Sequence, residues 1–300
     1  MKITNKAGLP EAFVRAVKAF EDEYDSEGAY LTASSISDPP RQRMLKNKHR
    51  DELTEDATER VWAVAGQAMH KVLEMSARPE DIVERRFGYN FAYTDPPSLV
   101  SAKIDLYEPD TCRLTDWKST SAWTLVYKDR LADWTAQLNV GARLMKLVGE
   151  YEVREVQVVA YLRDWSAYDA AKSADYPQQP VVVVPLELWP IEVTERFICD
   201  RLQLNKSADR GSFLPQCTPE ERWQKADVYA VMKPGRKSSL KNCDTVNEAN
   251  SVASTTPGAY VVKRPGSSVR CQKYCVVGRD TGFCGQWESE RNGASEVANG

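Results

Sequence analysis

The sequence has no long apolar segment and few of the residues that mark fibrous or low-complexity chains. No run approaches the roughly 18 consecutive apolar residues that a membrane-spanning helix requires. Glycine and proline number 15 and 16 in 300 residues, too few for a collagen-like chain. The first twenty residues hold no apolar stretch ending at a small-residue cleavage site, so we expect no secretory signal. These absences predict a soluble cytoplasmic protein without membrane partners.

The chain also lacks a strong net charge and a nucleotide-binding loop. Its 40 basic and 43 acidic side chains give a net charge of −3, which argues neither for nor against a nucleic-acid partner. One basic run contains no acid, and it is either a solvated helix face or a phosphate contact. The run comprises Arg41, Arg43, Lys46, Lys48 and Arg50. Because no G-x4-G-K-[S/T] motif occurs, no ATP-driven motor is expected.

Hydrophobic periodicity predicts an α/β sandwich built on a mixed sheet rather than a regular βαβ repeat. Helices are expected over residues 11–24, 54–76, 129–148 and 187–204. Strands are expected over 82–93, 99–107, 111–117, 153–162 and 181–184. We divide the chain into a core over 1–207, a small Cys-containing module over 208–287 and a disordered tail over 288–300.

Two carboxylates and a lysine lie on neighbouring predicted strands. Asp116 and Lys118 are two residues apart, so a strand directs both to the same side, and a short hairpin brings Asp105 beside them. Oxygen ligands of this kind suit a hard divalent cation, to which the carbonyl of Trp117 is a plausible further ligand. Such an ion would stabilise charge on a phosphate and lower the pKa of a water, while Lys118 orients or deprotonates that water. By itself the pattern also fits an ordinary surface Asp/Lys pair.

Two predicted helices add candidate residues. Gly66, His70 and Glu74 recur at four-residue steps and therefore share one helix face. A histidine beside carboxylates can bind Mn²⁺ or Mg²⁺, although a lone helical histidine can equally be structural. Gln137, on the helix after Lys118, is placed to hydrogen-bond near such a metal or to DNA, or else to face solvent.

The order of these motifs resembles the RecB-like branch of the PD-(D/E)xK nuclease superfamily, and most of all the stand-alone nucleases of bacteriophages and prophages. The resemblance implies a restriction-endonuclease-like core over residues 30–165. It implies that His70, Asp105 and Asp116 ligate catalytic Mg²⁺ or Mn²⁺, that Lys118 is the catalytic lysine and that Gln137 is the family's helix glutamine. Glu74 and Glu84 occupy positions that are often acidic in such proteins, in supporting roles.

The activity implied is that of a metal-dependent deoxyribonuclease, most often an exonuclease in recombination, replication or repair. Its partners would be DNA and a recombinase, a single-strand-binding protein or a helicase. The alternative is a catalytically inactive DNA-binding or assembly protein on the same fold. The chain departs from the family at Ala102 and Lys103, where a glycine is frequent, and at Gly141, where an aromatic residue is frequent.

Five of the seven cysteines fall within the last 84 residues. Cys271, Cys275 and Cys284 are closely spaced, and Cys217 upstream is a candidate fourth thiol. In a cytosolic protein such spacing favours a metal over disulfides, although free structural thiols are the alternative. The metal is either a structural Zn²⁺ or a [4Fe-4S] cluster. Relatives with such a cluster place one cysteine before the nuclease core, whereas here none precedes Cys112.

Overall fold

The structure is a computed structural model that describes residues 1–23, 27–211, 213–279 and 281–298. The chain divides into two compact units. The larger unit comprises Lys2–Asp38 and Thr54–Ser212, and the smaller unit comprises Met1, Pro39–Leu53 and Phe213–Gly300. Each unit has its own hydrophobic core.

The larger unit alternates helices with strands, as the periodicity predicts. Its strands are β1 (Lys2–Thr4), β2 (Leu31–Thr32), β3 (Thr54–Asp56), β4 (Ile82–Phe91), β5 (Ser98–Glu108), β6 (Arg113–Thr120), β7 (Glu155–Leu162) and β8 (Val181–Leu186). Its helices are α1 (Glu11–Glu23), a 3-10 turn (Ala57–Arg60), α3 (Val61–Glu74), α4 (Ala122–Tyr127), α5 (Leu131–Gly149), α6 (Ala167–Lys172) and α7 (Ile191–Asp209).

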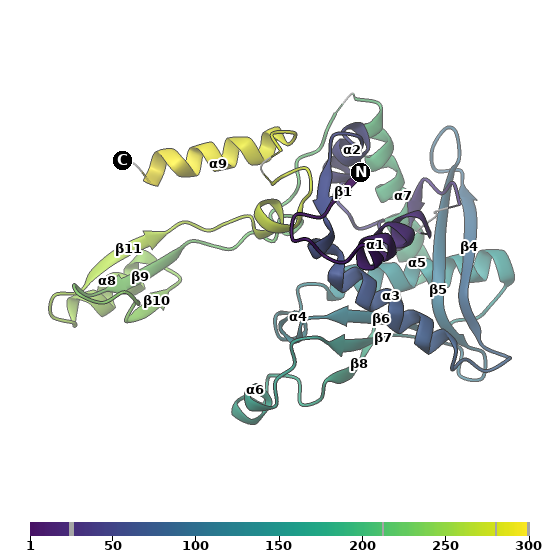
Figure 1. Cartoon of the computed structure of the whole chain (residues 1–300), viewed down its shortest axis with the longest axis horizontal. Coiled ribbons are helices and arrows are strands. Elements are labelled where there is room, and N and C mark those ends of the chain that lie inside the picture. Colours follow the sequence, from purple (N-terminus) through teal and green to yellow (C-terminus); the bar gives the residue numbers. More distant parts are fainter. Residues whose placement is uncertain (24–26, 212, 280, 299–300) are drawn as a thin grey trace. The chain divides into compact units, whose positions relative to one another are not determined.

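Six strands form one mixed sheet in the order β2-β5-β6-β7-β8, with β4 also paired to β5 (Figure 1). The pairs β4·β5, β5·β6 and β7·β8 are antiparallel, whereas β2·β5 and β6·β7 are parallel. This mixed α/β architecture confirms the coarse fold prediction. A restriction-endonuclease-like core remains a prediction.

Strands β5 and β6 pair over a short stretch and then separate. Residues 106–108 of β5 pair with residues 113–115 of β6, and the next pair in that register would be Asp105 with Asp116. On the other side of β5, the register sets Val83 opposite Leu106, so Glu84 falls opposite Asp105. Three carboxylates from three neighbouring strands therefore meet where the sheet opens.

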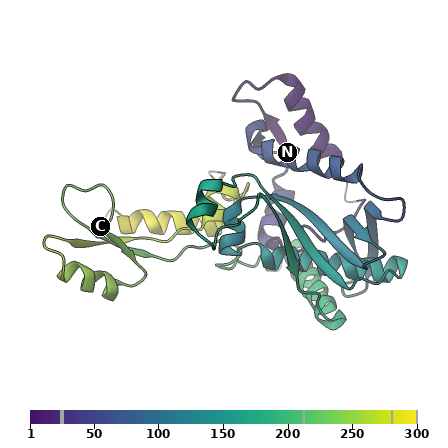
Figure 2. The same cartoon turned by 90° about the horizontal axis from the view of Figure 1, so that it is seen from below.

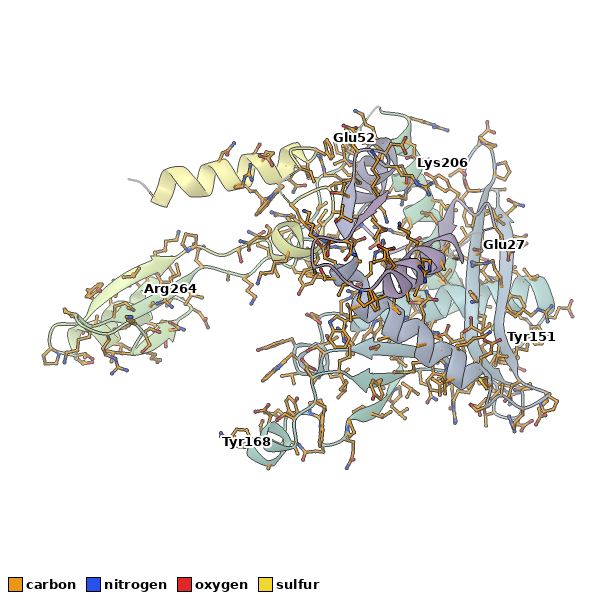
Figure 3. The ribbon with its side chains drawn as sticks, in the orientation of Figure 1. Glu27, Glu52, Tyr151, Tyr168, Lys206 and Arg264 are labelled. Carbon is orange, nitrogen blue, oxygen red and sulfur yellow. The ribbon has the colours of Figure 1, made fainter. Side chains whose placement is uncertain are left out.

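Helices pack on this sheet and bring further residues to the opening (Figures 1 and 2). Helix α5 contacts β4, β5, β6, β7 and α7, while α3 contacts β5 and β6. The apolar side of α5 is buried in the main core. Tyr151, labelled in Figure 3, lies just beyond α5. Its ring packs edge-on against those of Phe87 and Tyr107, with ring centroids 5.8 and 5.7 Å away. These contacts fix the strands on which the carboxylates lie.

The smaller unit contains short elements around the second core and around a separate small apolar cluster. They are α2 (Pro40–Lys48), β9 (Val228–Met232), β10 (Lys241–Cys243), α8 (Val246–Ser254), β11 (Tyr260–Arg264), a π-helical turn (Arg270–Tyr274) and α9 (Gly285–Ala298). The strands form an antiparallel sheet in the order β10-β9-β11, and α8 packs against it.

The predicted division of the chain is wrong in one respect: residues 39–53 belong to the smaller unit rather than to the core over 1–207. Leu45 and Leu53 pack in the second core with Val277 and two cysteines. The Arg41 guanidinium donates to the carbonyls of Leu214 and Pro215, each at 2.9 Å. At least one residue of the basic run therefore has a structural role.

Over residues 288–298 of the predicted disordered tail the structure has helix α9, and residues 299–300 lie outside the described residues. Its first turns are fixed by specific contacts. Trp287 packs against the second core, and the Glu290 carboxylate pairs with Arg222 and accepts from Ser268 Oγ at 2.8 Å. Within the described ranges, no helix is both long enough and apolar enough to cross a bilayer.

Candidate metal centre

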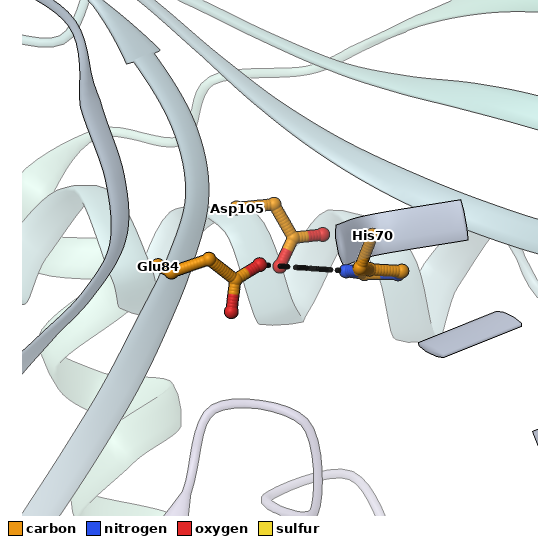
Figure 4. A group of neighbouring side chains, drawn as sticks. All are labelled: His70, Glu84 and Asp105. Atoms are coloured by element: carbon orange, nitrogen blue, oxygen red, sulfur yellow. Dashed lines mark ion pairs between the residues drawn. The ribbon is translucent and has the colours of Figure 1, made fainter. Parts of the chain in front are cut away.

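Three side chains of the larger unit point toward one another where the sheet opens (Figure 4). His70 comes from α3, Glu84 from β4 and Asp105 from β5. One potential ligand atom from each lies within 4.8 Å of the other two. His70 Nδ1 is 3.7 Å from Glu84 Oε1 and 3.5 Å from Asp105 Oδ1. The sequence predicted His70 and Asp105 here, but gave Glu84 only a supporting place.

Glu84 reaches this position through an unusual backbone conformation. Its φ is +51°, in the left-handed region, and the β4·β5 ladder pairs its two neighbours but omits Glu84 itself. A non-glycine residue held there costs about 1–3 kcal/mol, and such residues gather at functional sites. The other Glu84 oxygen pairs with Lys103, and His70 and Lys103 together hold the pKa of Glu84 down at about 2.

His70 also contacts the backbone of Trp117, which lies between Asp116 and Lys118 on β6. Its Nε2 lies 3.2 Å from the Trp117 carbonyl oxygen, and the Trp117 N–H donates to Asp105 Oδ2 at 2.9 Å. Burial favours the neutral imidazole, but hydrogen bonds with Asp105 and Glu84 raise the pKa of His70 to about 10. Without a metal, His70 is therefore a cation at neutral pH, and binding a metal through Nδ1 requires the loss of that proton.

Asp116 and Lys118 form a buried pair beside this group. Asp116 is 5% exposed, its Oδ2 lies 2.7 Å from Lys118 Nζ, and its Oδ1 accepts from Gln137 Nε2 at 2.7 Å. Burial raises the pKa of Asp116, and the negative charge of Asp105 raises it further. The positive charge of Lys118 lowers this pKa but does not cancel the rise. Burial lowers the pKa of Lys118, but the two carboxylates raise it by more. Lys118 is therefore held charged at its position.

All of these side chains line one cavity of about 1060 Å³. Glu74 also lines it, but its carboxylate pairs with Lys71 at 2.7 Å and is not among the three grouped ligands. Gly141 on α5 lies at the cavity wall, where a Cβ would approach Ile104 Cδ1 to 3.2 Å. The family's frequent aromatic residue would not fit at that position.

The donor set fits a hard divalent cation. His70, Glu84 and Asp105 would hold such an ion through an imidazole and two carboxylates whose atoms already lie within 4.8 Å of one another. Asp116 Oδ2 is buried and has no hydrogen-bond partner of proper geometry, despite the nearby ammonium of Lys118. Such an orphaned oxygen is what a further ligand would present.

The smaller unit brings together the four predicted cysteines. Cys271, Cys275 and Cys284 are buried and Cys217 is half-buried. Burial, and then the charges of Glu221 and the other three thiols, raise the pKa of Cys217 to about 12. Burial, and then the neighbouring Cys275, raise that of Cys271 to about 12. Among the described residues, however, no three thiols approach within 4.8 Å of one another.

Two local contacts hold the thiols in place. The Gln286 side chain accepts from the Cys217 N–H at 2.8 Å and donates to the Cys217 carbonyl at 3.0 Å, which joins that segment to the turn after Cys284. Gly278 permits a tight chain crossing, because a Cβ there would lie 2.8 Å from the Cys271 carbonyl oxygen. Cys243 packs in a separate cluster with Val231 and Ala249.

Comparison with known proteins adds little to this geometry. No protein-family model matches the chain, and no curated protein matches it. Five chains of known structure do match. One, from the crystal structure of a protein called SSO0001, is 11% identical and is aligned over 64% of this chain and 84% of its own, with a TM-score of 0.42. A likeness this loose carries no argument about family or activity.

Proposed function

We propose that the chain is a metal-dependent deoxyribonuclease of the RecB-like PD-(D/E)xK type, with its active site in the cavity of the larger unit. The observation that carries this proposal is the convergence of His70, Glu84 and Asp105 beside the buried pair Asp116 and Lys118. An exonuclease of phage or bacterial DNA metabolism is the form that the motif order favours.

Each side chain has a defined task in this proposal. His70, Glu84 and Asp105 hold Mg²⁺ or Mn²⁺, with Asp116 and the Trp117 carbonyl as further oxygen donors. Such an ion supplies charge stabilisation at the phosphate and acidifies water. Lys118 orients the attacking water and neutralises charge that develops on the phosphate. Gln137 keeps Asp116 Oδ1 fixed, so that Oδ2 stays beside Lys118 Nζ.

The four thiols of the smaller unit fit a metal centre that shapes the protein rather than one that reacts. Four thiolates would hold either a structural Zn²⁺ or a [4Fe-4S] cluster, and of the two we favour the cluster. Absorbance near 400 nm with bound iron supports the cluster, and stoichiometric zinc in a colourless protein contradicts it.

Cleavage of labelled DNA tests the nuclease proposal. Linear and covalently closed circular DNA are incubated with Mg²⁺, with Mn²⁺ and with a chelator, using wild type and Lys118→Ala side by side. We expect metal-dependent loss of linear DNA that is absent in the variant. Circular dichroism of both proteins checks that the fold is retained.

The other outcomes separate the alternatives. Cleavage of circles as well would assign an endonuclease at the same site. Cleavage that persists in Lys118→Ala would overturn the site assignment. If DNA is bound but not cleaved under either metal, the chain is the inactive DNA-binding or assembly protein that the motifs also allow.

A further inference from the structure

One indole side chain at the wall of the cavity is largely open to solvent. Trp62 is 56% exposed and lines the cavity. It lies on α3 eight residues before His70, which places it about 12 Å along the helix axis from the candidate metal ligands. A large aromatic side chain left this open, next to a polar site, is a candidate binding surface.

Trp62 is held from one side by a cation. The Arg163 guanidinium carbon lies 4.7 Å from the centroid of the Trp62 ring, within the range of a cation–π contact. The backbone N–H of Arg163 donates to the Thr120 carbonyl at 2.9 Å. This hydrogen bond anchors the arginine backbone to the end of β6, two residues beyond Lys118. Arg163 therefore holds the Trp62 indole in one orientation and places a positive charge beside it, while more than half of the residue faces solvent.

Two further aromatic rings continue from the same end of β6. Trp123 and Tyr127 on α4 are 44% and 71% exposed and stack with ring centroids 5.9 Å apart and planes 24° apart. Helix α4 is fixed at its start, because Ser121 Oγ caps it and donates to Asp164 Oδ2 at 2.6 Å. The Asp164 segment is the one that carries Arg163, so both aromatic groups rest on one support.

We propose that Trp62, Trp123 and Tyr127, called the aromatic track below, stack the bases of a single nucleic-acid strand whose phosphate lies in the cavity. This inference rests on the proposed function and names its substrate as single-stranded. Bases within a duplex are stacked on each other, whereas unpaired bases offer their faces to aromatic side chains. Arg163 supplies the charge that such surfaces combine with stacking.

Binding in chelator tests the track without cleavage. Wild type, Trp62→Ala and Trp62→Phe are titrated with a fluorescent oligothymidylate and with a duplex of the same length. Stacking on one aromatic side chain is worth about 5- to 150-fold in affinity, so Trp62→Ala should weaken binding of the single strand by about tenfold. Trp62→Phe should retain most of the affinity, and duplex binding should change less than twofold.

Tyr89 offers a matched control in the same unit. It is 39% exposed and contacts Phe91, and by strand alternation it faces away from the side on which Arg86 lines the cavity. Tyr89→Ala should bind the single strand like wild type. The double variant Trp123→Ala/Tyr127→Ala should also bind the single strand more weakly than wild type. Thermal unfolding of every variant confirms that the larger unit is folded.

Each remaining outcome decides the inference. Unchanged single-strand affinity in Trp62→Ala overturns it, and so does an equal loss in Tyr89→Ala or in duplex binding. If wild type binds no nucleic acid and Trp62→Ala instead changes the sedimentation of the protein, the surface is a protein interface and the inference is wrong. A protein that binds single strands through Trp62 but never cleaves them keeps the inference and removes the proposed nuclease. If Trp62→Ala cleaves single strands with an unchanged KM, the proposed nuclease is kept and the inference about the aromatic track is wrong.

Discussion

The two candidate metal centres of this chain differ in donor atoms, in the elements that carry them and in access. The centre of the larger unit uses carboxylates and an imidazole on strands and a helix, and it opens into a cavity. The centre of the smaller unit uses thiols on loops and short turns that are packed into a core. Structural metal sites are closed, whereas catalytic ones keep a position open to substrate. On the proposal made above, the chemistry of the chain is separate from the element that secures its fold.

The largest expected effect comes from the open centre. Asp105→Asn removes a charged ligand without changing the shape of the side chain, and it should lower the rate of DNA cleavage by about 10³-fold. The Trp117 N–H still has an oxygen to which it can donate, so the melting temperature should stay within a few degrees of wild type. Rates are measured with linear DNA at saturating Mn²⁺. A loss of less than tenfold would falsify the role given to Asp105.

A substitution in the thiol centre of the smaller unit should affect stability rather than metal binding in the cavity. Cys271→Ser removes one thiolate from a buried set, so bound iron or zinc should fall at least severalfold and the smaller unit should unfold at a lower temperature. Mn²⁺ affinity at the cavity should change less than twofold, because none of its ligands is a thiol. Elemental analysis and Mn²⁺ titration of the same preparation measure both. Loss of cavity affinity together with the thiol metal would show that the centres are not independent.

The pH dependence of metal binding sharpens the contrast. Metal-free His70 has a pKa raised to about 10. The stabilisation that its positive charge gains beside Asp105 and Glu84 is therefore fully present below the ordinary pKa of 6.5 and is lost as the pH rises through about 10. Binding a cation displaces this proton. The Mn²⁺ affinity should therefore rise by up to tenfold per pH unit between pH 6.5 and 8.5.

Titration calorimetry in two buffers of different ionisation enthalpy measures the proton released in this exchange. His70→Gln should bind Mn²⁺ more weakly, with an affinity that varies little over the same range. An affinity of wild type that is flat with pH would mean that His70 is not displaced from its carboxylates.

The smallest effects are expected at two matched glycines. Gly278→Ala places a methyl group 2.8 Å from the Cys271 carbonyl and should destabilise the smaller unit by about 1–3 kcal/mol. In Gly66→Ala the new Cβ meets only Ser119 Cβ, at 3.8 Å, and the helix gains about 0.5–1 kcal/mol. Chemical denaturation of both variants checks the signs. Equal destabilisation would contradict the packing described at α3.

Most of the larger unit could be predicted from its sequence because its elements carry strong local signals. The observed β4, β5, β6 and β7 agree with the predicted strands to within two residues at nearly every end. Helix α4 was not foreseen, because its six residues carry too little periodicity.

The site was predicted in part for the same reason. Asp105, Asp116, Lys118 and Gln137 follow from strand period and motif order, whereas the place of Glu84 depends on register. A hairpin centred on residue 96 would set Glu84 opposite Glu108, so the pairing of Glu84 with Asp105 could not be read from the turn. The packing of residues 39–53 with the smaller unit depends on long-range contacts such as that of Arg41, which leave no local pattern.

Mn²⁺ binding to a matched pair of glutamate variants tests the central claim most directly. Glu84 and Glu74 both line the cavity, but only Glu84 belongs to the three grouped ligands. Electron paramagnetic resonance counts free Mn²⁺ during titration of wild type, Glu84→Gln and Glu74→Gln, each held folded at the same temperature. We predict one Mn²⁺ in the cavity of wild type and of Glu74→Gln with equal affinity, and at least tenfold weaker binding in Glu84→Gln. Equal affinity in all three proteins, or no binding by wild type, would contradict a metal centre at this site.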